Sequence, residues 1–359
     1  MTQFQLAFDF SAPAEPVLLG LDAETIEALA NDSLPEISIP EIIAGITEPE
    51  QPPISEKLKC QILVVPEREA PKGFNRDYRI TDADEIGAGG LKAKFENNLA
   101  AIRLLKQLEQ ENRIEATQEE KHTLVRYCGW GALAQKAFSY NYEFYDLQRE
   151  LQELLTEEEH AQASASTVNA HYTSPMVINA IWRAARRLGI QAQSRILEPA
   201  AGIGHFLGLQ PEDLKSNSRV AVEIDATSAA ILRLLYPDTT VRACGFQQPG
   251  LPLNFFDLAI SNVPFGKYGV HDIQFKSKPR LCSAIHDYFF AKALAHLRPG
   301  GLLAFITSRY TLDKKDEYLR RHLDEHAVFL GAIRLPGGKD GAFAQNAGTE
   351  VTTDIIFLR

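Results

Sequence analysis

The sequence predicts an α/β protein with a largely parallel sheet and crossover helices. From Ser194 onward, short apolar strands alternate with helical stretches; the strands are RILEPA, VAVEID, FDLAIS, LLAFITS and a terminal DIIFLR. Alternation of this kind is typical of a parallel sheet whose strands are joined by helices. In such sheets ligands bind beyond the carboxyl ends of the strands. The residues that could do chemistry fall at those positions.

The chain before this region divides into two parts. In residues 1–70, runs such as SAPAEPVLL and EPEQPPISE have a proline in nearly every short apolar cluster, which favours an extended, partly disordered arm. The alternative is that LDAETIEALAND forms a short docking helix. Between 71 and 165 the pattern is helical, because apolar residues recur at three- and four-residue steps: Phe95, Leu99, Ile102, Leu105 and Leu108. We therefore predict an acidic arm at 1–70, a small helical module at 71–165 and an α/β domain at 166–359.

Composition limits the class of protein. Of the 359 residues 45% are hydrophobic, enough for a sizeable core. No stretch is apolar enough to span a bilayer, and the first residues carry no basic segment that would open a secretory signal. The four cysteines are far apart, so we expect free thiols in a reducing cytoplasm and no metal site.

Charge is unevenly distributed along the chain. The net charge is −10, but residues 1–56 hold eleven acidic residues and no lysine or arginine, which leaves +1 for the remainder. A neutral body can still present a local basic face, so a nucleic-acid partner remains compatible with the composition.

The first candidate site is the segment Glu198-Pro199-Ala200-Ala-Gly202-Ile-Gly204, directly after an apolar strand. Small residues there let the backbone approach a ligand closely, although a tight strand-to-helix turn would use the same residues. A dinucleotide loop would have a third glycine, and a phosphate loop would have Gly-Lys-Ser/Thr. The segment therefore favours a nucleoside without phosphates.

The next strand, Val220-Ala-Val-Glu223-Ile-Asp225, ends in acidic residues about 20 residues further on. A carboxylate at this place can accept hydrogen bonds from both hydroxyls of a ribose. Glu223 is the first choice for that contact and Asp225 the second. Asp225 is equally suited to cap the following helix.

The most specific segment is Ser261-Asn262-Val263-Pro264-Phe265-Gly266, directly after the strand DLAI. It resembles the Asn-Pro-Pro-Tyr/Phe motif of amino-group methyltransferases, which act on adenine N6 in DNA and on a few other planar amides or amines. The resemblance implies that Asn262 and a backbone carbonyl near Val263 and Pro264 hold the target amine, while Phe265 stacks on an extruded base. Val263 departs from the family, which most often has proline there.

Other segments extend this resemblance over residues 171–359. Tyr172-Thr173-Ser-Pro175 is similar to the element by which such enzymes hold the methionine part of S-adenosylmethionine; the alternative is simple helix capping. The stretch from His286 to LLAFITS resembles the fifth unit of the methyltransferase fold. GWGAL, NAHYTSP, EPAAGIGHF, NVPFG and TSRYTLD together resemble the methylase region of large phage and plasmid proteins that fuse a methylase to a helicase. No helicase motif is seen here.

Two assignments are weaker. After the third strand the family often has an acidic residue facing the cofactor adenine; this sequence has Phe246 and Gln247, of which Phe246 is the candidate contact. Beside the catalytic motif lies a loop with four basic residues that could contact DNA phosphates or be a solvated surface loop: Lys267, Lys276, Lys278 and Arg280. His271 and His286 are expected to be structural, since the chemistry needs no neutral base.

These resemblances imply a Rossmann-like, seven-stranded class I methyltransferase domain preceded by the helical module and the arm. The implied cofactor is S-adenosylmethionine, the implied substrate is adenine N6 in DNA, and a partner chain could supply target recognition. The alternatives are methylation of an RNA base or a protein glutamine, and a non-catalytic DNA-associated protein that keeps the fold.

Overall fold

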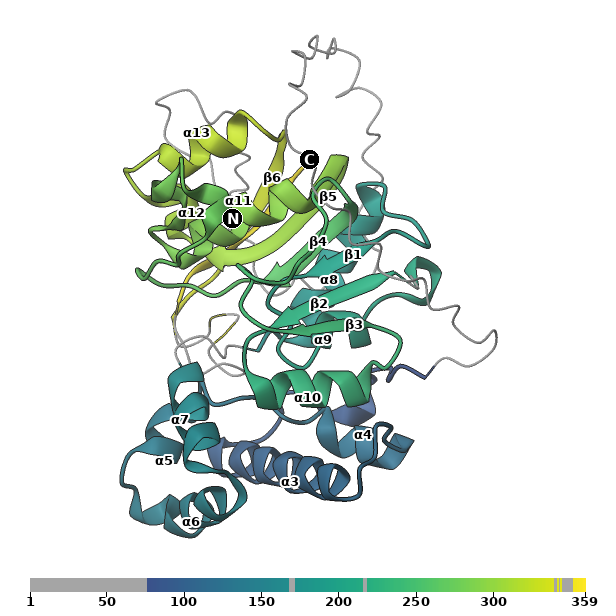
Figure 1. Ribbon diagram of the computed structural model, residues 1–359, viewed down its shortest axis with the longest axis vertical. Coiled ribbons are helices and arrows are strands. Elements are labelled where there is room, and N and C mark those ends of the chain that lie inside the picture. Colours follow the sequence, from purple (N-terminus) through teal and green to yellow (C-terminus); the bar gives the residue numbers. More distant parts are fainter. Residues whose placement is uncertain (1–75, 168–171, 216–217, 339–340, 342, 344–350) are drawn as a thin grey trace, which may run out of the picture.

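The computed structural model describes residues 76–167, 172–215, 218–338, 341, 343 and 351–359. Its centre is a seven-stranded sheet in the order β3-β2-β1-β4-β5-β7-β6 (Figure 1). The strands are β1 (Ile196–Glu198), β2 (Arg219–Glu223), β3 (Thr240–Ala243), β4 (Phe256–Asn262), β5 (Leu297–Ser308), β6 (Phe329–Leu335) and β7 (Thr353–Leu358). The first five run parallel, and β7 lies antiparallel between β5 and β6. The seven-stranded α/β fold expected from the sequence is therefore confirmed.

Helices cover both faces of the sheet. One face packs on α8 (Pro175–Arg187) through Leu258, Ile260 and Leu302, while the other packs on α11 (Ile285–His296) through their neighbours Ala259 and Leu303. Such alternation is what a strand buried on both faces requires. The remaining helices of this part are α9 (His205–Gly208), α10 (Ala226–Leu235), α12 (Tyr310–Asp313) and α13 (Tyr318–Asp324), with 3-10 turns η3 (Glu212–Leu214), η4 (Ile273–Phe275) and η5 (Pro279–Cys282).

The predicted helical module forms a separate layer beyond α10 (Figure 1). It contains η1 (Asp82–Asp84), α3 (Leu91–Gln110), α4 (Gln118–Leu124), α5 (Ala134–Phe138), η2 (Tyr142–Phe144), α6 (Tyr145–Leu154) and α7 (Glu157–Ser166). The apolar face predicted for 95–108 is buried, and the Thr117–Glu120 capping box is formed. Trp130 is 1% exposed and its ring meets Phe95 edge-on at 5.3 Å. The module therefore has its own aromatic centre.

The module also shares a core with the α/β part. One continuous cluster of buried residues runs from α3 and Trp130 to Ile203, beside the loop after β1, and to Leu232 and Tyr236 at α10. The buried ion pair of Arg219 with Asp77 ties the start of β2 to the segment before the module. The boundary near residue 165 stays a prediction, and the arm at 1–70 lies outside the described residues. None of the described helices is long and apolar enough to cross a membrane.

Candidate active site

Three neighbouring parallel strands end in residues that the sequence singled out. Glu198 is the last residue of β1, Glu223 of β2 and Asn262 of β4. In the sheet β1 lies between β2 and β4, so the three residues stand at the same edge. This edge is the crevice in which open α/β sheets bind ligands.

The loop after β1 is held by the acid at the end of β2. The backbone N–H of Gly202 donates to Glu223 Oε2 at 2.7 Å, and that of Asp225 donates to Oε1 at 2.8 Å. Gly202 has φ +56°, a left-handed conformation that favours glycine, and a Cβ there would lie 3.2 Å from the hydroxyl of Tyr172. Gly204 has φ +85°, and a Cβ there would clash with Leu232 of α10 at 2.5 Å. Gly202 therefore allows Tyr172 to approach the loop, and Gly204 allows the loop to pack on α10.

Glu198 is buried without a full set of hydrogen bonds. Its side chain is 1% exposed, and its Oε2 has no hydrogen-bond partner among the residues that the structure describes. Burial, together with the charge of Glu223, raises the pKa of Glu198 well above its usual range. Burial also raises the pKa of Glu223 to about 7. A ligand that brought a hydrogen-bond donor or a positive charge to this place would relieve an unfavourable arrangement.

The segment before α8 closes over this loop. The Tyr172 ring meets that of His205 at 5.1 Å, and Thr173 is buried. Burial raises the pKa of Tyr172, and the nearby charges of Glu223 and Asp225 raise it further. Burial and the charge of Asp225 also raise the pKa of Tyr127, which belongs to the helical module. The module thus lies beside the predicted cofactor loop, which its sequence did not indicate.

The predicted catalytic motif is joined to the cofactor loop by one hydrogen bond. Ser261, the residue before Asn262, donates from its hydroxyl to the carbonyl of Ala200 at 3.2 Å. The side-chain oxygen of Asn262 is shielded from solvent. Val263 is 1% exposed, and its N–H donates to the carbonyl of Ile306 in β5 at 3.1 Å. Packing and this bond hold the position at which the family most often has proline.

The other side of the motif rests on two helices. Pro264 is half-buried, and Phe265 is partly buried against the core cluster that includes α8. His286 of α11 hydrogen-bonds the backbone of Gly266, and burial lowers the pKa of its imidazole. This agrees with the structural role expected for His286.

Two predicted cofactor contacts have other partners in the structure. The carboxylate of Asp225 accepts from the N–H of Ser228 at 2.8 Å, so it caps α10. Phe246 is 3% exposed and packs on Phe289, with ring centroids 5.1 Å apart, and on His296. Its contact with a cofactor adenine stays a prediction, and Pro199 and Ala200 remain candidates by position in the loop.

The loop that carries the predicted DNA-contacting lysines and arginine is anchored to neighbouring helices. Buried Asp272 accepts hydrogen bonds from Lys292 and Tyr288 of α11, both at 2.7 Å. Arg280 pairs with Asp316 at 3.0 Å and stacks over the ring of Tyr318. The remaining basic residues of the loop differ in exposure: Lys278 is half-buried, whereas Lys267 and Lys276 are exposed.

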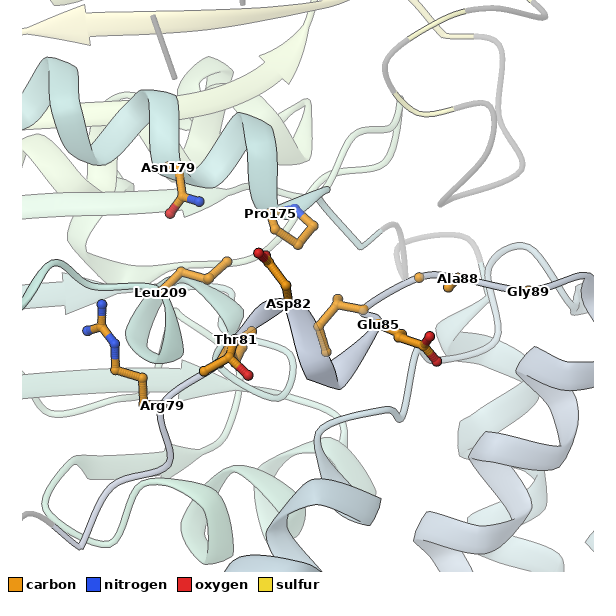
Figure 2. Close-up of a pocket in the computed structure, with 12 residues that line it drawn as sticks. Arg79, Thr81, Asp82, Glu85, Ala88, Gly89, Pro175, Asn179 and Leu209 are labelled. Carbon is orange, nitrogen blue, oxygen red and sulfur yellow. The ribbon is translucent and has the colours of Figure 1, made fainter. Parts of the chain in front are cut away.

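A cavity of about 750 Å³ opens beside this region, between the segment from Arg79 to Gly89 and the start of α8 (Figure 2). Thr81 and Asp82 line one side, and Pro175 and Asn179 of α8 line the other. Pro175 ends the predicted methionine-binding segment, but neither Tyr172, Thr173 nor any predicted cofactor contact at the ends of β1 and β2 lines the cavity. It is separate from the edge formed by Glu198, Glu223 and Asn262.

Sequence reasoning gave no role here to Ser261 or Tyr127, and it did not foresee which backbone His286 would contact. Ser261 had one usable signal, because it is a polar residue inside an apolar strand directly before Asn262. Tyr127 had none, since its place depends on how the module docks. For His286 the contact with Gly266 could not be read from a separation of 20 residues along the chain.

The chain is similar in sequence to a phage protein and similar in fold to several solved structures. No family model matches the chain. Over 197 residues, 54% of its length, the chain is 30% identical to the defense against restriction protein B of Escherichia phage P1. The match takes up 8% of that phage protein, so the chain corresponds to a small part of it.

The chain is similar to a Listeria monocytogenes structure described as a class I S-adenosylmethionine-dependent methyltransferase, at 17% identity, with 74% of this chain and 88% of that chain covered and a TM-score of 0.46. It is also similar to a modification subunit of a type I restriction enzyme from Vibrio vulnificus (18% identity, 62% and 50% covered, TM-score 0.43). A third similar structure is described as an RNA methyltransferase of Pyrococcus horikoshii (17%, 53% and 86%, TM-score 0.38). The sheet order, the single antiparallel strand and the glycine loop after β1 give the chain the fold of the class I S-adenosylmethionine-dependent methyltransferases.

Proposed function

We propose that the chain transfers a methyl group from S-adenosylmethionine to the exocyclic N6 amine of adenine in DNA. The observation that carries the proposal is the hydrogen bond from Ser261 to Ala200, because it joins the Asn262 motif to the predicted cofactor loop. An amine bound at Asn262 would then lie beside the ligand of that loop. Positioning of two reactants in this way is the main contribution expected from the protein in such a transfer.

The residues at the sheet edge fit this cofactor. Buried Glu198 has an oxygen without a partner in the described chain, and a cationic or N–H-bearing ligand would supply one. Glu223 keeps Gly202 in place and presents an acidic group next to it, as a ribose diol requires. Tyr172 and Thr173 would hold the methionine end. When bound, the cofactor supplies an electrophilic methyl group on a sulfonium.

Asn262 accounts for the choice of an amine. An exocyclic amine on a purine is a poor nucleophile because its lone pair is delocalised into the ring. Acceptors at Asn262 and at the backbone of Val263 and Pro264 would bind both N–H groups and favour a pyramidal nitrogen. Such preorganised acceptors act most strongly where water is excluded, and the side-chain oxygen of Asn262 is shielded.

No general base is required of the nearby histidine. His286 is buried and already hydrogen-bonded to the backbone of Gly266, and its pKa is lowered by burial. It therefore serves to hold the turn that carries Phe265. Phe265 would stack on a base that has left the duplex. Exposed Lys267 and Lys276 would contact phosphates, and a partner chain would supply sequence recognition.

The alternatives remain an RNA base, a protein glutamine, or a non-catalytic protein. The last was suggested by Val263, but its burial and its bond to Ile306 hold the loop without a proline. This favours an active site over a degenerate one.

The substrate class is tested by labelled methyl transfer from S-adenosylmethionine to unmethylated plasmid DNA, total RNA and a glutamine peptide. The digested products are identified by mass spectrometry. We expect N6-methyladenine in DNA. Label only in RNA or peptide would contradict the DNA assignment, and cofactor binding without transfer to any of the three would favour the non-catalytic protein.

The role of Asn262 is tested by single-turnover transfer with Asn262→Ala. The loss should appear in the rate and not in cofactor affinity, and one such positioned group is commonly worth about 2.7–4 kcal/mol, roughly a hundredfold or more. Phe265→Ala should weaken capture of the base by about 1–3 kcal/mol, whereas Phe265→Trp should keep stacking. An Asn262→Ala enzyme as fast as wild type would remove the motif from the chemistry.

A further inference from the structure

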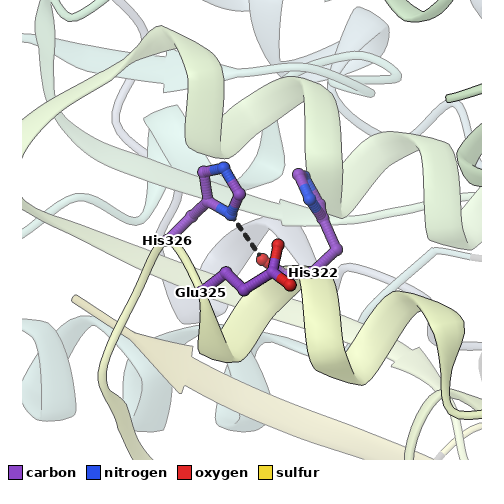
Figure 3. A group of neighbouring side chains, drawn as sticks. All are labelled: His322, Glu325 and His326. Carbon is purple, nitrogen blue, oxygen red and sulfur yellow. Dashed lines mark hydrogen bonds between the residues drawn. The ribbon is translucent and has the colours of Figure 1, made fainter. Parts of the chain in front are cut away.

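A group of metal-ligating side chains lies at the end of α13, and none of the three is a predicted catalytic or cofactor-binding residue. His322, Glu325 and His326 each offer a ligand atom, and these atoms lie within 4.8 Å of one another (Figure 3). His322 lies in the last turn of α13, and Glu325 and His326 lie in the turn that directly follows the helix. Their rings are 4.2 Å apart between centroids. We propose that these three residues bind one divalent transition-metal ion, a site that goes beyond the proposed function.

A hydrogen bond fixes the tautomer of His326. Its Nδ1 lies 2.7 Å from the carbonyl oxygen of His322 (Figure 3), and since a carbonyl only accepts, Nδ1 carries the proton. The lone pair of the neutral ring is therefore on Nε2. Metal-binding histidines commonly donate their other ring N–H to a backbone carbonyl, which fixes the tautomer and the direction of the ring.

Exposure allows the ligands to close around an ion. Glu325 and His326 are exposed and His322 is half-buried. Tetrahedral Zn²⁺ with bonds of about 2.0–2.1 Å needs ligand atoms about 3.3 Å apart, so no pair of ligand atoms has to approach by more than about 1.5 Å. Rotation of exposed side chains supplies a movement of that size. Water would complete the coordination.

The ligand set selects the class of ion. Two imidazoles and one carboxylate suit Zn²⁺, Cu²⁺, Ni²⁺ or Co²⁺, whereas Mg²⁺ and Ca²⁺ prefer oxygen ligands. Among the described cysteines, Cys128, Cys244 and Cys282 are not part of the group. The sequence expectation of no metal rested on cysteine spacing, and it did not consider two histidines at the end of a helix.

A neighbouring lysine provides a distinctive test. Lys278 Nζ lies 3.4 Å from His322 Nδ1, and an ammonium can only donate, so Nδ1 accepts. If the ion binds Nδ1, that lone pair is used; if it binds Nε2 of the neutral ring, Nδ1 carries the proton. In either case Lys278 loses its acceptor. Metal binding must therefore displace Lys278. The positive charge of its ammonium group also lowers the affinity for a cation.

The experiment is calorimetric titration of Zn²⁺ into the untagged full chain, with Co²⁺ absorption as a second readout of coordination. We expect one ion per chain. His322→Ala and His326→Ala should each weaken Zn²⁺ binding at least about tenfold, and Glu325→Gln should weaken it less. Lys278→Met, which keeps the side-chain stem and removes the charge, should tighten binding severalfold.

The control is His271→Ala, because His271 is another exposed histidine and lies outside the group. It should leave Zn²⁺ affinity unchanged. Circular dichroism and thermal unfolding without metal separate lost ligands from lost fold. Failure of wild type to bind at millimolar Zn²⁺, or equal affinity in the His322→Ala, His326→Ala double variant, would overturn the site. An unchanged affinity in Lys278→Met would overturn the displacement of the lysine.

Discussion

Two buried carboxyl groups on different sides of the site differ in the number of hydrogen-bond partners that they have within the described residues. Asp272, in the loop after the catalytic motif, is 6% exposed and accepts hydrogen bonds from Lys292, Tyr288 and the N–H of Gln274. Glu198, at the end of β1, is 1% exposed, yet its Oε2 has no partner among the described residues. Burial acts on both, but only Asp272 has a cation and donors to offset it.

The difference separates structural groups from ligand-binding groups. Burial alone would raise the pKa of Asp272, but hydrogen bonds from Lys292 and Tyr288 hold it below its usual value. The pKa of Glu198 is raised by burial and by Glu223. A buried acid that the fold itself satisfies contributes to a fixed loop, whereas one left unsatisfied indicates a place where something else binds.

The largest effect is expected when the satisfied acid is removed. Asp272→Ala leaves Lys292 buried without its main partner, and breaking a buried pair in this way commonly costs about 3–5 kcal/mol in the free energy of unfolding. Asp272→Asn should cost less, since it keeps an acceptor for Tyr288. Urea unfolding measures both. If Asp272→Ala is as stable as wild type, the network does not anchor the loop.

Unlike the Asp272 variants, Glu198→Gln should not lower the free energy of unfolding. It removes an ionisable group that the fold does not satisfy, so the free energy of unfolding should stay the same or rise. Affinity for S-adenosylmethionine, measured by calorimetry, should fall by about 1–3 kcal/mol because the carboxyl partner of the ligand is lost. A variant that is destabilised and binds the cofactor normally would make Glu198 a structural residue like Asp272.

Gly202→Ala tests the loop beside Glu198, with Gly250→Ala as its matched control. Both glycines have similar positive φ, +56° and +62°, so each alanine should destabilise the fold by about 1–2 kcal/mol. A Cβ at Gly250 meets nothing within 4 Å, whereas one at Gly202 meets the hydroxyl of Tyr172 at 3.2 Å. Only Gly202→Ala should weaken cofactor binding. Equal cofactor affinity in the two variants would place the ligand elsewhere.

The smallest effect concerns pH and Glu223. Its folded-state pKa is raised to about 7 from a usual 4.5, so between these pH values the folded protein holds more protons than the unfolded chain. Stability must then fall as pH rises through that window. Relative to Glu223→Gln, wild type should lose about 1 kcal/mol between pH 5 and 8, after allowance for partial solvent exposure. Urea unfolding at both pH values checks the sign; a gain instead of a loss would mean that the two backbone donors outweigh burial.

The alternation of strands and helices, and the residues at which β1, β2 and β4 end, followed from local patterns. Glu198, Glu223 and Asn262 each end an apolar run, and parallel strands bring such ends to one edge. The capping box at Thr117 and the buried face of α3 depend on neighbouring residues alone, so they too were predictable.

Contacts made across long separations were not predictable. Whether Asp225 would cap a helix or face a ligand depends on the orientation of one rotamer, and the structure has the cap. Phe246 was a candidate contact for the cofactor adenine, and its packing on Phe289 of α11 could not be read from the sequence. The bond from Ser261 to Ala200 spans 61 residues, and nothing in either segment alone requires it.

The position of β7 has a consequence for how the chain is assembled during synthesis. Among the described strands β7 comes last in sequence, yet it pairs with β5 on one side and β6 on the other. Until it has emerged from the ribosome, the apolar edge of β5 has no neighbour on that side and β6 cannot join the sheet. An open hydrophobic edge of this kind is a template for wrong pairing with other chains. A nascent chain that stalls before Thr353 should therefore be a substrate for chaperones.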